Sequence, residues 1–287
     1  MAAPYRPKAL VVANKAAAPA MLGLRPLEYL GHGAQFTYVA LRSIPLALRH
    51  YPQQCLRIFN EMAWGRGAVI VGGGTVAVLV VLGLAIGASL GIEAYAALDL
   101  VGMGSLTGVI SSFGNTRELA PLAAALGFAC QAGCRMTAEI GAMRINEEID
   151  AIETLAIRSI PFVVTTRVIG GLAAIVPAYL ITLILSYVAA GSVSLLLHGE
   201  ASGTYYHYFD QFISGWDIFA SVIKVVVFAT AVLLIHGYQG FFASGGPAGV
   251  GIASGRAIRA SLVAVAALNM VMTMVLWGIS PTIEFTG

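Results

Sequence analysis

The sequence is poor in charged residues. Its 287 residues include 16 basic and 14 acidic side chains, whereas 58% of the residues are hydrophobic and the mean hydropathy is +0.84. A water-soluble domain of this size needs more charge on its surface, so we interpret the chain as an integral membrane protein. The net charge of +2 decides nothing by itself, because membrane orientation depends on where Lys and Arg lie and not on their total.

The sequence also lacks the motifs by which a chain binds nucleotides. Its only lysines are Lys8, Lys15 and Lys224, and none follows a glycine, so the phosphate-binding loop G-x-x-x-x-G-K-[ST] does not occur. Residues 102–107 begin like a dinucleotide fingerprint, but its last glycine is missing. We therefore expect a non-catalytic chain with no cofactor of its own. Any ATP and Mg²⁺ would be bound by another chain.

Cysteine and histidine are too sparse for a convincing metal site. Cys55, Cys130 and Cys134 form neither a disulfide framework nor a zinc-finger spacing. Cys130 and Cys134 share a helix face, but no third ligand is near them in sequence, so a packing role is favoured over a soft-metal site. His198 and His207 offer a second candidate pair, yet a solvated loop is the simpler interpretation. We predict no metal site.

Long apolar segments make up most of the chain. Five of them are long enough to cross a bilayer as helices, so we predict an all-α integral membrane protein with five transmembrane helices in a domain spanning residues 67–287. The predicted spans are Gly67–Leu90, Leu119–Met143, Phe162–Tyr187, Ile218–Tyr238 and Ile258–Ile279. Residues 98–113 remain as a short, non-crossing or re-entrant element on the outer side.

Residues 1–66 carry half of the basic side chains. These are Arg6, Lys8, Lys15, Arg25, Arg42, Arg49, Arg57 and Arg66. Apolar residues recur between the later arginines, and Pro45 and Pro52 interrupt the run, so we expect a cytoplasmic segment with interfacial helices whose arginines contact lipid phosphates. Residues 92–115 and 193–216 contain no Lys or Arg. The positive-inside rule then places the N-terminus in the cytoplasm and the C-terminus outside.

Glycines recur at helical spacing in the first predicted span. Gly83, Gly87 and Gly91 form two overlapping small-xxx-small steps. Such steps let two helix backbones approach closely inside a membrane, so we predict a close helix crossing here. Glycines that face lipid without a partner are the alternative.

Carboxylates are concentrated just after the second predicted span. The group consists of Glu147, Glu148, Asp150 and Glu153. Ile145, Ile149 and Ile152 recur at helical spacing opposite Glu147 and Asp150, which predicts an amphipathic helix at residues 145–158 lying on the membrane surface.

This helix has recognisable start and stop signals. Asn146 is suited to cap its first turn, and Pro161 limits its length. We expect the acidic side to offer Glu147 and Asp150 to a partner in water. A solvated acidic face without a partner is the alternative.

Four charged residues in the predicted spans or at their start need an explanation: Arg117, Glu118, Glu139 and Lys224. An ionisable group inside a membrane costs several kcal/mol unless it is paired or hydrated. Lys224 lies seven residues past Asp217, roughly 10 Å into its helix. Glu139 is best explained as a structural partner of Arg135.

Three sequence motifs appear in a fixed order. They are R-E-L-A-P-L from Arg117, A-E-I-G-A-M-R-I from Ala138, and E-E-I-D-A-I-E-T-L-A-I from Glu147. With this order and spacing the chain resembles the MlaE/YrbE family, the permease subunits of ABC-type lipid transporters that work with MCE proteins. It looks most like a YrbE subunit of an actinobacterial Mce system. It departs from the family at residues 129–133, where Cys130 and Gln131 replace a usual glycine and arginine.

The resemblance implies a function and a set of partners. It implies that the chain, in the inner (plasma) membrane, couples separate ABC ATPase subunits to the movement of a phospholipid, fatty acid or related lipid. The expected partners are a second YrbE-type permease, identical or a paralogue, and an extracytoplasmic MCE assembly; no nucleic acid is expected. Glu147, Glu148, Asp150 and Glu153 would then contact the ATPase.

The resemblance also implies a substrate cavity. It suggests that Arg117, Glu118 and Lys224 lie near a lipid head group. Tyr95 is added on weaker grounds, because no motif fixes its position. The alternative for the three charged residues is a buried ion pair that fixes the register of neighbouring helices.

Two other function classes are less well supported. A lipid-modifying integral membrane enzyme needs His or Asp residues clustered at one membrane face, and the sequence has no such cluster. An ion-driven carrier is expected to show inverted repeats and paired broken helices, which five spans do not provide. Co-purification of an ATPase would separate the permease from both alternatives.

Overall fold

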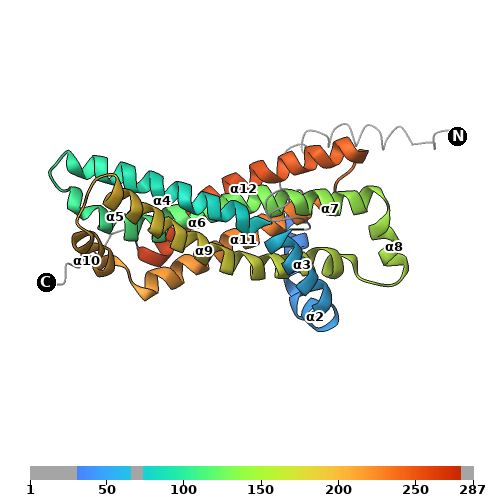
Figure 1. The fold of residues 1–287 in the computed structure, drawn as a ribbon. Helices are drawn as coiled ribbons and strands as arrows, with labels where there is room; N and C mark the ends of the chain where they lie inside the picture. The colour runs from blue at the N-terminus through green and yellow to red at the C-terminus, as the bar shows by residue number, and fades with distance from the viewer. Residues whose placement is uncertain (1–30, 66–73, 279–287) are drawn as a thin grey trace, which may run out of the picture.

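The structure is a computed structural model that describes residues 31–65 and 74–278. Within these ranges every regular element is a helix, and the helices form an elongated bundle (Figure 1). The prediction of an all-α membrane protein is therefore confirmed. Figure 1 shows α8 at one end of the bundle and α5 with α10 at the other.

The chain begins with short helices. Residues 31–42 are helical, and α2 (Ile44–His50) and α3 (Pro52–Trp64) follow. Pro45 lies in the first turn of α2, and Pro52 is the first residue of α3, because proline fits a helix start but interrupts a helix interior. Ile58 and Met62 of α3 are buried, whereas Leu56 is exposed. The predicted domain boundary at residue 66 lies outside the described residues.

Four helical segments among the described residues are long and apolar enough to cross a membrane. They are α4 (Thr75–Asp99), residues Ile160–Leu196, which join η4 (Ile160–Thr165) to α9 (Thr166–Leu196), α11 (Gly215–Phe241) and α12 (Gly246–Trp277). The first predicted span continues past Leu90 to Asp99, and the part of it before residue 74 is not described. The second predicted span, Leu119–Met143, is not among the four, so the count of five stays a prediction.

The second predicted span is part of a longer helical path. This path consists of α5 (Thr107–Gly114), η2 (Asn115–Leu119), α6 (Ala120–Phe128), η3 (Ala129–Gly133) and α7 (Cys134–Ile145), where η2 and η3 are π-helical turns. Residues 98–113 contain the end of α4, a turn and most of α5, and their assignment to a non-crossing or re-entrant element on the outer side stays a prediction. The chain turns at Gly102, whose positive φ of 72° suits glycine, and α5 then continues directly into the motif region.

Pro121 has a specific effect on this helical path. Proline has no backbone N–H, so the carbonyl of Arg117, four residues earlier, loses its usual helical donor. The Lys224 ammonium donates to that carbonyl at 2.6 Å. The proline of the R-E-L-A-P motif thus opens a backbone acceptor inside the bundle, and α11 supplies the donor.

The glycines of α4 pack against α9. Gly83, Gly87 and Gly91 are all buried, and a Cβ atom at Gly87 would overlap the backbone carbonyl of Ser186. The predicted close helix crossing is confirmed. Helix α11 packs against α12, α7 and α9.

Candidate functional site

Lys224 lies at the centre of a buried polar cluster between α11, α12 and η2. Its side chain is completely buried. The ammonium donates to the Arg117 carbonyl oxygen, to Glu118 Oε1 at 3.1 Å and to Thr273 Oγ1 at 2.8 Å. All three of its hydrogens therefore have acceptors, which is what a buried ammonium requires.

Glu118 accepts hydrogen bonds from two side chains of α12. The Thr273 hydroxyl lies 2.6 Å from Glu118 Oε1, and Asn269 Nδ2 donates to Oε2 at 2.8 Å. With Lys224, three side chains from two helices contact this carboxylate. Its side chain nevertheless remains 35% exposed, so the carboxylate marks the open side of the cluster.

Arg117 extends the cluster toward Asp217 at the N-terminal end of α11. Its Nη2 lies 3.1 Å from both carboxylate oxygens of Asp217, and the Trp277 indole N–H donates to the same carboxylate. The guanidinium also stacks on Phe113, with 4.1 Å between its carbon and the ring centroid. Asp217 itself is fixed by Ser214, whose hydroxyl accepts the Asp217 backbone N–H at the start of α11.

The structure thus brings Arg117, Glu118 and Lys224 together, as the family resemblance suggested. Sequence reasoning missed four further members of the cluster: Asp217, Asn269, Thr273 and Trp277. A signal was present, since Asn269, Thr273 and Trp277 recur every fourth residue on one face of a predicted span. Ser214 and Asp217 also match the spacing of an N-terminal capping box.

Several polar atoms at the cluster have spare hydrogen-bonding capacity. Arg117 Nε, Asn269 Oδ1 and both side-chain polar atoms of Asn115 are buried without a hydrogen-bond partner among the described residues. Buried polar groups normally find a partner, so these atoms are suited to water or to a polar group of a ligand. The adjoining π-helical turn η2 is an element that often occurs at functional sites.

Tyr95 is not part of this cluster. Its ring stacks on His198 with centroids 3.8 Å apart, and it lies next to Gly104. None of its hydrogen bonds or ring contacts within the described ranges involves Arg117, Glu118 or Lys224. The structure therefore does not bring Tyr95 together with the other predicted cavity residues, because its ring lies against Gly104 and His198 instead.

The acidic helix is shorter than predicted. It forms α8, Glu148–Thr154, rather than residues 145–158. Asn146 does not cap it: this residue ends α7, and Glu147 takes the N-cap position with a left-handed φ of 58°. Ile149 is buried as expected. Pro161 does not set the end of α8 but lies in the first turn of η4.

All four carboxylates near α8 are exposed, but two are already engaged. Asp150 accepts a hydrogen bond from Arg144 at 2.7 Å, and Glu153 accepts one from the Ser159 hydroxyl. The side-chain carboxylates of Glu147 and Glu148 form no hydrogen bond or ion pair with another described residue. The carboxylates most available to a partner are therefore Glu147 and Glu148, rather than Glu147 and Asp150.

A second ion-pair network joins α3, α7 and α9 at the α8 end. Arg135 pairs with Glu139 at 2.9 Å and donates to the Glu61 carbonyl oxygen at 3.1 Å. Arg167 lies 3.6 Å from the other Glu139 oxygen. The interpretation of Glu139 as a structural partner of Arg135 fits this geometry.

The cysteines and histidines considered as metal ligands do not form a cluster in the described part of the chain. Across the described residues, no group of three His, Cys, Asp or Glu side chains is arranged to hold a metal ion. His207 packs against Tyr208, Cys130 is exposed on η3, and Cys134 is half-buried.

The fold and this buried cluster define a multi-pass membrane protein with a polar site inside its helix bundle. The sequence profile of the family described as "Permease MlaE" matches residues 64–275, and the chain belongs to this permease family. The match covers α4 to α12 almost completely, including every residue of the charge cluster except Trp277.

Individual proteins show the same relationship. A Haemophilus influenzae protein named "Intermembrane phospholipid transport system permease protein MlaE" is 27% identical over 262 residues, 90% of this chain and 96% of that protein. A "Probable ABC transporter permease protein" of Rickettsia bellii is 28% identical over 65% of this chain and 72% of its own length. The chloroplastic protein TRIGALACTOSYLDIACYLGLYCEROL 1 of Arabidopsis thaliana is 25% identical over 60% of this chain and 49% of that protein.

Proposed function

We propose that this chain is the permease subunit of an ABC-type lipid transporter in the inner (plasma) membrane, with its N-terminus in the cytoplasm. It pairs with a second YrbE-type permease and moves a phospholipid, fatty acid or related lipid between the membrane and an extracytoplasmic MCE assembly. The similarity to a phospholipid permease over 90% of the chain supports the substrate class. A separate ATPase supplies the energy, since the sequence contains no phosphate-binding loop.

The observation that carries this proposal is the charge cluster at Glu118. A buried cation, Lys224, holds a carboxylate that is still 35% exposed, and Arg117 lies beside it with an unpartnered Nε. A lipid head group brings its own charges and hydrogen-bond acceptors out of water. Charged groups that are already desolvated and fixed can orient such a head group at little further cost.

Contact with the ATPase is assigned to α8. This helix lies at one end of the bundle, buries Ile149 against the core and leaves four carboxylates in contact with solvent (Figure 1). An exposed acidic helix held by Ile149 and the partly buried Ile152 suits a groove lined with basic or amide groups on a cytoplasmic subunit.

Two measurements test the proposal. The tagged full-length chain, purified from its own membranes, should co-purify an ATPase and an MCE protein, identified by mass spectrometry. A photoactivatable phospholipid should crosslink to peptides containing Glu118, and Glu118→Gln should reduce this crosslinking about fivefold, whereas Asp210→Asn, an exposed carboxylate on α10 (Ser202–Phe212), should not. Recovery of the chain without an ATPase, or with a lipid that it has chemically altered, would support the lipid-modifying enzyme instead.

A further inference from the structure

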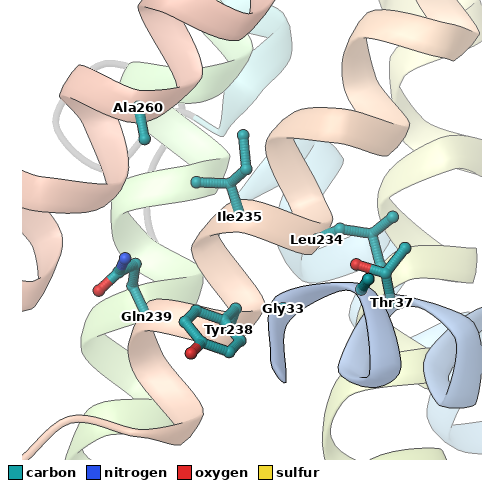
Figure 2. A pocket seen from close by; sticks show the side chains of 8 residues that line it. Gly33, Thr37, Leu234, Ile235, Tyr238, Gln239 and Ala260 are labelled. Atoms are coloured by element: carbon teal, nitrogen blue, oxygen red, sulfur yellow. The ribbon is translucent and has the colours of Figure 1, made fainter. Parts of the chain in front are cut away.

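A groove lies on the bundle far from the charge cluster. It has a volume of about 280 Å³ and is formed by the helix of residues 31–42, α11 and α12. Figure 2 shows α11 as its floor, with Leu234, Ile235 and Tyr238, while Thr37 and Ala260 project from the two sides. Leu234 is the groove residue of α11 nearest to Lys224 in sequence. It lies ten residues from Lys224, roughly 15 Å along the helix, so the groove is separate from the cluster.

The groove exists because its walls carry small side chains. Gly33 and Ala34 form one wall and Ala260 the other. A Cβ atom built at Gly33 would meet no heavy atom within 4 Å, so there is unfilled space at this wall. The lining is mainly apolar. A hydrocarbon chain fits such a lining better than water does.

A positive charge lies one helical turn from the groove. Arg256 precedes Ala260 by four residues and therefore shares its face of α12, about 6 Å nearer the start of that helix. Its side chain is exposed and forms no hydrogen bond or ion pair with any described residue. By contrast, the neighbouring Arg259 donates to the Gly255 carbonyl of its own helix. Arg256 is thus the cation available to a ligand in the groove.

We propose that this groove binds an anionic phospholipid, with an acyl chain between Gly33 and Ala260 and the phosphate at Arg256. Charge favours this occupant over another segment of the chain. Residues 1–30 contain four basic side chains and a single acidic one, so Arg256 repels them. Arg256 attracts a lipid phosphate, and one basic residue near anionic lipid strengthens binding about fivefold.

The site is tested with diazirine-labelled phosphatidylglycerol and phosphatidylcholine on the full-length protein in nanodiscs. We expect phosphatidylglycerol to crosslink to the peptide containing Leu234 and Ile235 more strongly than phosphatidylcholine. Arg256→Gln should lower phosphatidylglycerol crosslinking about fivefold, to the level of phosphatidylcholine. Gly33→Leu should fill the groove and lower the crosslinking of both probes.

Gly251→Leu is the matched control. Gly251 also has no heavy atom within 4 Å of a built Cβ, but it lies nine residues before Ala260, on the opposite face of α12. It should leave both probes unchanged. Equal crosslinking of the two lipids that does not respond to Arg256→Gln would overturn the proposal. Crosslinking of the groove to residues 1–30 or to a partner's helix, with no lipid adduct, would also overturn it. Arg256→Gln alters an exposed side chain, so this arm stands even if Gly33→Leu fails to fold.

Discussion

The Lys224 ammonium lies 3.1 Å from the Glu118 carboxylate and is completely buried, whereas the Glu118 side chain is 35% exposed. The two members of this ion pair therefore face different surroundings. Lys224 is enclosed by Arg117, Glu118 and Thr273, which use all of its donors. Glu118 is the member that can still meet a ligand, so the two residues should respond differently to mutation.

Replacing Lys224 with methionine should destabilise the protein. The change removes the donor of the Arg117 carbonyl and one partner of Glu118, and breaking a buried ion pair typically costs about 3–5 kcal/mol. The measurement is the midpoint of thermal unfolding of the purified full-length chain in detergent. Arg259→Met, which removes an exposed cation from α12, is the control. An unchanged midpoint together with weaker lipid crosslinking would show that Lys224 serves the ligand rather than the fold.

Asp217 should also matter for stability, although sequence reasoning did not assign it to the cluster. Its side chain is 7% exposed and bridges Arg117 and Trp277. Asp217→Asn keeps an oxygen for the indole but removes the charge opposite Arg117, so we expect a loss of about 1–3 kcal/mol. Thermal unfolding should show a lower midpoint for this variant than for Asp210→Asn. Equal midpoints would mean that Arg117 is satisfied without Asp217.

The sequence predicted the helices because long apolar runs have few stable alternatives in a membrane. The family resemblance grouped Arg117, Glu118 and Lys224, which the cost of unpaired charges inside spans had already marked as needing partners. The sequence could not assign Asn269 and Thr273, because uncharged polar residues are common in membrane helices and only the packing of α12 against η2 brings them to Glu118.

The errors in the prediction also have physical causes. The second span was predicted to begin at Leu119, but Asn115–Glu118 continue the helix because Asp217, Lys224 and α12 satisfy their charges. Tyr95 was misplaced because no motif fixes its position, and its ring packs against His198 and Gly104. The acidic helix begins later than expected, because Glu147 adopts a left-handed conformation that ends the preceding helix.

A larger side chain at Gly87 should prevent α4 from packing on α9. A Cβ atom there would overlap the Ser186 carbonyl, and backbone atoms cannot move aside as a flexible side chain can. We expect Gly87→Val to cost at least about 1–3 kcal/mol, seen as a reduced yield of monodisperse protein in size-exclusion chromatography. Gly203→Val on α10, where nothing lies within 4 Å, should retain the parent yield. A normal yield for Gly87→Val would show that the two helices can separate without penalty.

The predicted membrane orientation can be tested by cysteine labelling. Ser202→Cys should react with an impermeant maleimide on intact cells, and Ser254→Cys only after the membrane is opened, because the segments without Lys or Arg are expected outside. Cys130 and Cys134 should first be replaced by alanine. Cys55 can remain, since burial raises the pKa of its thiol and leaves little reactive thiolate at neutral pH. Reversed accessibility of the two positions would rule out this orientation.

The final prediction concerns the two unengaged carboxylates at α8. Glu147→Gly with Glu148→Ala should remove the acidic surface offered to the ATPase, and glycine at 147 suits the left-handed backbone of that residue. We expect the double variant to reach the membrane normally but to lose at least about tenfold in ATPase co-purification, which corresponds to ~1.4 kcal/mol. The control is Glu153→Ala, because Glu153 is already bonded to Ser159. If both variants recover the ATPase as well as the parent chain does, the docking role of α8 is wrong. If only Glu153→Ala loses it, the contact lies at the end of α8 and not at its start.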